Sequence, residues 1–552
     1  MKILVFTTDV PPLGGLPTSG TALRTYGMVQ GLRAHGHEVV VSAPKTALAG
    51  LRQNNDISSL PTEVIKELND LDEYSFDSFN QADLLAQLKP DAILCGHWPA
   101  MSLKVKPKQP LIIDLAGPHL LERHYQGSEN QKGAILAKLA VIATSDYFII
   151  SGPSQRLYFF SFLLRAGIDH PEKRTCCVPM PLSPDLPERN FQDSESFPRF
   201  IFGGVFLPWQ NPQHALRTLG DELGKRDKGH LQLVGGKHPN YEIKDGGYEE
   251  LFAQLSENPR VNTKPMMPLD SFINELTKAD VALDVMSWNL ERQLAMTIRS
   301  TTYLWSGLPV IYNDFADLGG LIKQYDAGWT VKPGDTQALE GIVDEIYKNP
   351  ELVRQKSVNA QRLARELFSW DKAVEPVLEL LGCKQSEKYH HTDIVFDCPE
   401  SADYPVYGNK KVQQYFVCRA PGLTKVECRI ATHNRRELAP VTFRLFKLPN
   451  AKSDRGLNPQ NEQKDLICEQ VHKPIHTQNN DWLTLETAPL QDSCGGAYML
   501  EMESSESPEQ ESISPWAIKS SPYPMVGLYY GQQKVDYSGL CLRTTCLNTP
   551  QS

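Results

Sequence analysis

Residues 287–313 read SWNLERQLAMTIRSTTYLWSGLPVIYN, and this stretch decides the fold of the chain. It opens with a loop that carries Glu291, continues as an amphipathic helix with Arg299 on it, and ends in an apolar run at 310–312 that is typical of a buried strand. A turn that places an acid at the mouth of a parallel sheet, followed by a helix N-terminus, suits a ligand with phosphates and hydroxyls. The stretch therefore predicts an α/β fold with a ligand site at its strand ends.

Short apolar runs alternate with helical periods on both sides of this stretch. In the first part the predicted strands are 2–6, 38–42, 92–95, 111–114, 147–150 and 176–178, with helices such as 22–35 and 82–88. In the second part the predicted strands are 200–202, 231–234, 281–285, 310–311 and 330–331, and the helices 213–224, 248–255, 269–278, 336–347 and 351–368. This alternation predicts parallel sheets covered on both faces. We therefore expect two tandem Rossmann-like domains, 1–187 and 188–383, around a proline-dense connection at 179–198.

The pattern of predicted elements changes after residue 383. Short strand-like runs follow, separated by long polar loops, at 414–418, 425–431, 441–447, 482–486, 497–502 and 539–544. Because no long helical period accompanies them, an all-β sandwich or jelly roll is predicted over 390–549. Within it, residues 504–514 read SSESPEQESIS, whose low complexity predicts a mobile loop.

The composition is that of an ordinary globular protein, with 41% hydrophobic and 22% charged residues over 552 positions. A formal net charge of -10 gives no electrostatic footprint for nucleic acid. The first apolar run, 3–6, is too short for a signal peptide, and no apolar window is long enough for a membrane-spanning helix. The eleven cysteines show no Cys-x-x-Cys pair and no zinc spacing, so we expect reduced thiols in a cytoplasmic protein.

Glycine-bearing turns follow the first strand of each predicted domain. In the first, Gly14 and Gly15 allow close backbone approach, and the helix after them could meet a diphosphate with its free N–H groups. The spacing is not that of an NAD fingerprint, and a flexible surface loop is the alternative. In the second, Gly203 and Gly204 end a strand, and Trp209 either stacks on a ligand or packs in the cleft. The next strand ends at Gly235 and Lys237, where a base or a phosphate could sit.

Four acids and histidines near strand ends are the candidate catalytic residues. Asp114 closes a buried strand, and Glu291 follows another, at the edge where open α/β sheets bind ligands. His97 and His119 follow strands of the first domain and could hydrogen-bond a sugar hydroxyl or an acceptor. Each acid also fits a solvated loop position, each histidine a structural one, and Arg299 a salt-bridge partner.

Several motifs in order carry a resemblance to a known family. They are MKILVFTTDVPP, GLRAHGHEVVVSAP, IIDLAGPHLLE, SGPSQR, FGGVFLPWQNP, LVGGKHP, LERQLAMTIRSTTYLWSGLPVIYND and DAGWTVKPGD. In this order the chain resembles, over about 1–382, the nucleotide-sugar glycosyltransferases of the GT-B fold, in the retaining group 1 or family four. The resemblance implies a helix at about 369–382 that crosses back onto the first domain. It also implies metal-independent transfer of a sugar with retention, and no DxD-like metal motif stands at a strand end.

The resemblance also implies roles for individual residues. Glu291 would contact the donor sugar near the reacting centre, and backbone amides around Asn289 and Leu290 would hold it. Gly14, Gly15 and the helix of Arg24 would approach the diphosphate from the other domain. The family's second glutamate, which binds the ribose, is replaced here by Arg299 or by Thr302, depending on how the motif is aligned. The usual cations after Gly204 are also missing, so Arg299, Arg24 or Lys237 would have to replace them.

The sequence therefore predicts a glycosyltransferase with a UDP- or GDP-linked donor, no other cofactor and no metal, and a glycan or lipid-linked oligosaccharide as acceptor. By resemblance the pathway is bacterial surface polysaccharide biosynthesis, with the β-rich part as an accessory carbohydrate-binding domain. Association with the inner face of a membrane and the oligomeric state stay open. The alternatives are a nucleotide-sugar epimerase or a phosphorylase on the same fold, and a non-catalytic glycan-binding scaffold.

Overall fold

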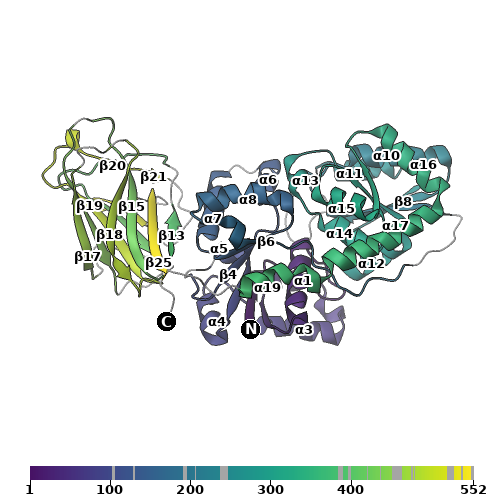
Figure 1. Ribbon diagram of the computed structural model, residues 1–552, viewed down its shortest axis with the longest axis horizontal. Helices are drawn as coiled ribbons and strands as arrows, with labels where there is room; N and C mark the ends of the chain where they lie inside the picture. The colour runs from purple at the N-terminus through teal and green to yellow at the C-terminus, as the bar shows by residue number, and fades with distance from the viewer. Residues whose placement is uncertain are drawn as a thin grey trace.

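The computed structural model describes residues 1–101, 103, 106–127, 131–189, 196–205, 207–236, 246–382, 389–395, 399–418, 421–435, 437–449, 463–473, 477, 479–518, 527–535 and 539–548. Two parallel six-stranded sheets with helices on both faces are followed by a separate region of antiparallel strands (Figure 1). The predicted fold class, two tandem Rossmann-like domains and a β-rich region, is confirmed.

The first parallel sheet has the strand order β2-β1-β3-β4-β5-β6. Its strands are β1 (Lys2–Phe6), β2 (Glu38–Ser42), β3 (Ala92–Gly96), β4 (Leu111–Asp114), β5 (Tyr147–Ile150) and β6 (Thr175–Cys177). The helices are α1 (Gly20–Ala34), α2 (Lys45–Asn54), α3 (Thr62–Glu73), α4 (Gln81–Leu88), α5 (His97–Met101), α6 (His119–Tyr125), α7 (Gln131–Ala143), α8 (Pro153–Arg165) and α9 (Pro171–Arg174). Successive strand residues pack into two different cores, one on each face, which explains why the strands are apolar throughout.

The second parallel sheet has the order β12-β11-β10-β7-β8-β9. Its strands are β7 (Arg199–Val205), β8 (His230–Gly236), β9 (Val261–Lys264), β10 (Val281–Asp284), β11 (Val310–Asn313) and β12 (Gly328–Val331). The helices are α10 (Gln213–Arg226), α11 (Tyr248–Leu255), α12 (Leu269–Lys278), α13 (Leu290–Leu294), α14 (Ile298–Trp305), α15 (Asp317–Tyr325), α16 (Thr336–Lys348) and α17 (Pro350–Leu363). This sheet also separates two cores.

The stretch 287–313 differs from its prediction in one respect. Glu291 was expected in a loop, but it lies in the first turn of α13, and a second helix, α14, begins at Ile298. Asn289 starts α13 early because its side-chain oxygen caps the backbone N–H of Arg292 at 2.9 Å. Glu291 is therefore held by a helix and not by a flexible loop.

The chain returns to the first domain after the second sheet. A π-helical turn (Ala364–Phe368) extends α17, and the short helices α18 (Trp370–Ala373) and α19 (Glu375–Gly382) follow. Val374 and Val377 lie in the same core as Ile3 and Met28 of the first domain. The two parallel domains are thus joined at two places, by the connection between β6 and β7 and by this returning segment.

The β-rich region contains two larger antiparallel sheets, β13-β25-β15-β18 with β20 on β15, and β17-β16-β19-β14-β22-β23. Its strands are β13 (Tyr389–Val395), β14 (Val412–Val417), β15 (Leu423–Ala431), β16 (Val441–Lys447), β17 (Asp465–His472), β18 (Trp482–Leu490), β19 (Ala497–Glu503), β20 (Ser514–Pro515), β21 (Ala517–Ile518), β22 (Gly527–Tyr530), β23 (Gln533–Val535), β24 (Gly539–Leu540) and β25 (Leu542–Asn548). One core takes side chains from both sheets, so they pack face to face. Residues 512–514, inside the predicted mobile loop, are buried.

The β-rich region packs on the first domain through α7. Leu136 and Ala140 of this helix belong to the core of the β-rich region, and Lys132 of the same helix forms an ion pair with Glu400 at 2.7 Å. Figure 1 shows the first domain lying between the β-rich region and the second domain. Among the described residues, no helix is long and apolar enough to span a bilayer.

The contact between α1 and the returning segment depends on Gly31. A Cβ at this position would lie 2.3 Å from the carbonyl oxygen of Trp370, where no real contact is possible. We expect Gly31→Ala to lower the free energy of unfolding by about 1–3 kcal/mol, measured by denaturant titration.

Gly50→Ala is the matched control, because Gly50 also lies inside a helix but nothing stands within 4 Å of its added Cβ. This change should raise stability by about 0.5–1 kcal/mol through helix propensity. Equal effects of the two substitutions would contradict the assigned contact.

Candidate functional site

The carboxyl ends of the two parallel sheets face each other across one cavity of about 850 Å³. The first domain contributes the N-terminus of α1, the α6 region and the N-terminal end of α8, and the second contributes the end of β7 together with α12, α13 and α14. Ligands of open α/β sheets bind at this edge, outside the carboxyl ends of the strands. The cavity is therefore the candidate functional site.

The two domains are in contact around this cavity. Gln155 of α8 donates from its side chain to the carbonyl oxygen of Leu294 at 3.1 Å, and Ser154 donates from backbone and hydroxyl to Asp317 at 2.9 and 2.5 Å. A Cβ added at Gly20 would lie 2.7 Å from Ile298, so the N-terminus of α1 abuts the start of α14. The two domains therefore touch each other directly beside the cavity.

Glu291 and Arg292 form a buried ion pair on the cavity wall. The carboxylate is 2% exposed and accepts from Nε and Nη2 of Arg292 at 2.7 and 2.8 Å. Burial alone would lower the pKa of Arg292, but Glu291 outweighs it and the pKa is raised. Arg292 is therefore charged at neutral pH, and a ligand meets a carboxylate that already has a partner.

Arg299 supplies a cation at the carboxyl end of β7. The sequence predicted a glycine turn here, but Gly203 and Gly204 belong to β7 itself and pair with β8. The guanidinium of Arg299 stacks on Phe202 at 4.9 Å and donates to Asp284 at 3.2 Å and to Gln210 at 3.0 Å. A Cβ on Gly204 would lie 2.8 Å from Nε of Arg299, so glycine is what lets the cation reach this strand end. Although burial lowers the pKa of Arg299, Asp284 more than compensates and the pKa is raised. The residues that directly follow Gly204 in the sequence include no cation, but Arg299 of α14 lies beside this glycine in space.

Arg24 and Asp114 are paired with each other. Nε and Nη2 of Arg24 donate to the two carboxylate oxygens at 2.8 and 3.0 Å, and both side chains are nearly fully buried. Arg24 reaches the cavity wall, but Asp114 is not among its lining residues. The geometry therefore gives Asp114 an ion-pair contact to Arg24, and its predicted catalytic role stays a prediction.

His119 lies at the first position of α6 and lines the cavity. Its Nδ1 is 3.1 Å from Oε2 of Glu122, one turn further along the helix. Burial alone would raise the pKa of the Glu122 carboxyl, but His119 and the cations Arg292 and Lys138 lower it below its usual range. His119 is thus held from one side by a carboxylate and presents its other edge to the cavity.

His97 lies behind this wall. It is 6% exposed, starts α5, and is not among the residues that line the cavity. Burial lowers the pKa of His97 well below its usual range, and the charges of Lys138 and His119 add to the effect. His97 is therefore neutral at physiological pH and does not reach the ligand space of this structure.

The remaining predicted site residues are divided among several places. Those that line the main cavity are Gly203, Gly204, Trp209 and Thr302. Those outside its wall are Gly15, Gly235, Asn289 and Leu290, while Gly14 lines a smaller cavity and Lys237 lies outside the described residues. Asn289 acts as a cap and donates from its side chain to the carbonyl oxygen of Trp209 at 2.7 Å, which fixes the loop that precedes Glu291.

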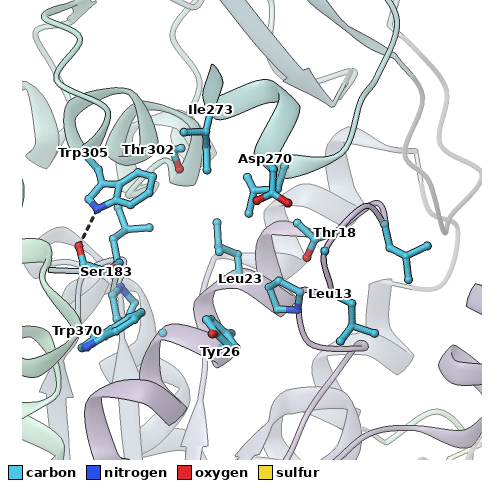
Figure 2. A pocket seen from close by; sticks show the side chains of 17 residues that line it. Leu13, Thr18, Leu23, Tyr26, Ser183, Asp270, Ile273, Thr302, Trp305 and Trp370 are labelled. Carbon is cyan, nitrogen blue, oxygen red and sulfur yellow. Dashed lines mark hydrogen bonds between the residues drawn. The ribbon is translucent and has the colours of Figure 1, made fainter. Parts of the chain in front are cut away.

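The smaller cavity, of about 260 Å³, adjoins the main one and shares Thr18, Leu23, Leu269 and Thr302 with it. Figure 2 shows the indole of Trp305 and the carboxylate of Asp270 on opposite sides, with Tyr26 and Trp370 below. Nε1 of Trp305 donates to the carbonyl oxygen of Ser183 at 2.7 Å, which fixes the indole plane. Asp270 has no hydrogen bond or ion pair with another described residue. The cavity is thus aromatic and apolar with one free carboxylate.

Sequence reasoning missed Arg292, Glu122 and Lys138. Arg292 stands next to Glu291, and Glu122 stands one helical turn after His119, so both spacings were visible. Lys138 carries no such signal, because a lysine inside an apolar helix is indistinguishable in sequence from an exposed one. Among the described residues, no cluster of three or more acids, histidines or cysteines has the geometry of a metal site.

No protein-family model matches the chain, and no curated protein matches it. Sucrose-phosphate synthase from Thermosynechococcus elongatus aligns with a TM-score of 0.49 and 17% identity, over 69% of this chain and 98% of its own. HepE from Anabaena in complex with UDP and glucose aligns with a TM-score of 0.47 and 13% identity, over 69% of this chain and 99% of its own. A glycosyltransferase from Rickettsia africae aligns with a TM-score of 0.46 and 15% identity, over 69% of this chain and 97% of its own. At these identities the likeness concerns the fold.

A double-mutant cycle tests whether Arg24 and Asp114 act as a structural pair. Replacing either residue by alanine leaves the other as a buried unpaired charge, which should cost about 3–5 kcal/mol of unfolding free energy. Because the double variant removes both charges, it should cost less than the sum, with a coupling of about 2–3 kcal/mol in denaturant titrations.

The surface pair Arg52 and Asp72 serves as the control. Its charges are 2.6 Å apart but 32% and 49% exposed, so its coupling should stay below about 1 kcal/mol. Additive effects at Arg24 and Asp114 would show that the pair does not stabilise the fold.

Proposed function

We propose that the protein is a glycosyltransferase that binds a nucleotide sugar between its two Rossmann-like domains. The observation that carries this proposal is that Arg299, beside Gly204 at the carboxyl end of β7, and Glu291 line the same cavity between the two domains. A cation beside a glycine at the carboxyl end of a parallel strand suits a diphosphate, and a buried carboxylate in the same cavity suits the hydroxyls of a sugar. The two groups match the two ends of a sugar–phosphate bond.

The orientation of the bound nucleotide sugar is inferred from the residues along one face of α14. Arg299, Thr302 and Trp305 recur every three residues on one face of this helix, and Thr302 lines both cavities. Six residues of helix span about 9 Å, which is close to the reach from a diphosphate to its nucleobase. We therefore place the diphosphate at Arg299, the ribose at Thr302 and the base in the smaller cavity, beside Trp305.

The transfer breaks the bond between the anomeric carbon and the phosphate oxygen and forms a bond to an acceptor hydroxyl oxygen. Negative charge grows on the departing diphosphate, where Arg299 and the N-terminus of α1 can stabilise it without a metal. The acceptor proton passes to the departing phosphate or to Nε2 of His119. Retention at the anomeric carbon, and a glycan or lipid-linked glycan acceptor in polysaccharide biosynthesis, are the finer parts of the proposal.

One observation favours a second candidate function, a glycan-binding protein without turnover. Glu291 is already paired with Arg292, and the position of the family's second acid holds Arg299 or Thr302, depending on how the motif is aligned. Such a protein would still bind nucleotides or sugars in the cleft, but it would not release the nucleotide from a nucleotide sugar. Turnover therefore separates the two candidates.

A panel of UDP-, GDP- and dTDP-sugars tests the proposal. A ligand that binds only the folded chain stabilises it and so raises the melting temperature. At a ligand concentration of a hundred times the Kd, the gain in unfolding free energy is about 2.7 kcal/mol. We expect the sugars of one nucleotide to raise the melting temperature, and we expect that nucleotide sugar to be hydrolysed slowly when no acceptor is present.

Glu291→Gln should lower this turnover about 10²–10³-fold and leave nucleotide affinity unchanged.

The control is Glu351→Gln, a carboxylate that is 85% exposed on α17 and far from the cleft. A circular-dichroism melt checks that both variants fold. Absence of any thermal shift with the whole panel would remove the support for a nucleotide-sugar enzyme, and full turnover in Glu291→Gln would refute the role of that residue.

The free carboxylate of Asp270 predicts which base the smaller cavity prefers. Guanine offers adjacent N1–H and N2–H donors to a carboxylate, whereas the single imide N–H of uracil lies between two carbonyl oxygens that a carboxylate repels. GDP should therefore bind more tightly than UDP in calorimetric titrations. Asp270→Asn should weaken the binding of GDP by about tenfold or more, which is the size of one charge-assisted bidentate contact. The affinity for UDP should stay unchanged or increase. Tighter binding of UDP to the unchanged protein would contradict this placement.

A further inference from the structure

The segment 151–156, which reads SGPSQR, has no part in the mechanism proposed above. It forms the turn after β5 and the first turn of α8, and it touches the second domain at two points. Ser154 is bound to Asp317, and the side chain of Gln155 is bound to the helix that carries Glu291. Because this helix belongs to the second domain, the contact of Gln155 joins the two domains that line the cavity.

The side-chain amide of Gln155 is fixed at both of its ends. Gln155 is 1% exposed, its Oε1 accepts from the backbone N–H of Ser151 at 3.0 Å, and its Nε2 donates to the carbonyl oxygen of Leu294 at 3.1 Å. The first contact decides which end of the amide is which, since only the oxygen can accept from a backbone N–H. The nitrogen is therefore turned to Leu294, and its hydrogen bond crosses from the first domain to the second.

Helix α13 is too short to hold its own position. It has five residues, and an isolated helix of this length is unstable. Its N-terminal end is held by Asn289, which caps the helix and donates to the carbonyl oxygen of Trp209 at 2.7 Å. Leu294 is its last residue, and the carbonyl groups of a last turn have no partner within the helix. Gln155 supplies such a partner, so Glu291 lies between two fixed ends.

We propose that Gln155 is a positioning residue for Glu291: from the first domain it holds the C-terminal end of α13 and so fixes the carboxylate against the donor sugar. Glu291 precedes Leu294 by three residues, which is less than one helical turn, so a shift of the Leu294 carbonyl moves Glu291 with it. Gln155 and Glu291 also line the same cavity. Gln155 therefore acts on the reaction through α13, and Glu291 makes the contact with the sugar.

The role of Gln155 rests on the proposed function, since it concerns the carboxylate that would contact the sugar. The same turn is also bound to the first-domain side of the cavity. The hydroxyl of Ser151 donates to the carbonyl oxygen of Ala116, in the loop that leads to His119 at the start of α6. One turn of the chain thus holds the segment before His119 and the end of the helix of Glu291, and it sets these two side chains relative to each other.

The test compares Gln155→Met with the unchanged protein, because methionine has a similar length but cannot donate to Leu294. We expect turnover of the nucleotide sugar to fall about 10–100-fold, the effect of a displaced reacting group, while the Kd of the free nucleotide changes less than about threefold. Added to Glu291→Gln, the change should cost little more, since both act through one carboxylate. Gln355→Met, at an exposed position of α17, is the control and should leave both quantities unchanged.

Gln155→Glu is the conservative variant. The new carboxyl group can donate to Leu294 only when it is protonated, and burial raises the pKa of a carboxyl group. Relative to the unchanged protein, turnover should therefore be near normal at low pH and should fall as the pH rises. Ser154→Ala is the matched comparison, because it removes a contact between the domains but leaves the contact of Gln155 with α13. Its turnover relative to the unchanged protein should not depend on pH.

Hydrogen exchange of the α13 amides, measured by mass spectrometry, does not need turnover. Exchange in peptides that cover 290–295 should be faster in Gln155→Met than in Ser154→Ala, and melting curves show which variants fold. Unchanged exchange with full turnover in Gln155→Met would overturn the proposal, as would a loss that is additive with that of Glu291→Gln. Absence of binding and turnover with every nucleotide sugar would instead refute the transferase function, and the exchange rates would still decide whether Gln155 holds α13.

Discussion

One face of α1 carries the close contacts on which the arrangement of the two parallel domains depends. Gly20, Gly27 and Gly31 follow each other at spacings of seven and four residues, which places them along the same side of the helix. A Cβ at these positions would collide with Ile298 of α14, with the carbonyl of Pro181 in the connection, and with the carbonyl of Trp370 in the returning segment. The second domain, the connection and the returning chain all meet the first domain at this helix.

The same helix also contributes to the cleft, which links the joining of the domains to the chemistry. Its N-terminus is capped by Ser19 and faces the cavity, and Arg24 reaches the wall from the next turn. Most buried charges of the site are paired: Arg24 with Asp114, Arg292 with Glu291, and Arg299 with Asp284. Such pairs fix side chains because an unpaired buried charge is costly. The charged side chains of the site are therefore held in fixed positions by their partners.

The β-rich region occupies the side of the first domain that faces away from the second domain. Its core is completed by Leu136 and Ala140 of α7, so it is packed on the first domain and is not a loosely attached module. Lys138 projects from a different face of this helix into the region behind the cleft. Helix α7 therefore contacts both the β-rich region and helix α6 at the cleft.

The sequence by itself determined the two α/β domains, the change to β strands after residue 383, and Glu291, Arg299, His119 and Thr302 as cavity residues, because strand alternation and turn motifs are local patterns. The sequence did not determine which charged side chains form ion pairs with each other. Asp114 and Arg24 are 90 residues apart and pair in space, Arg299 reaches Gly204 from another element, and Lys138 is buried only because α7 lies between two other layers. Only tertiary structure decided these contacts, since the pairing and the burial of a charge depend on neighbours that are distant along the chain.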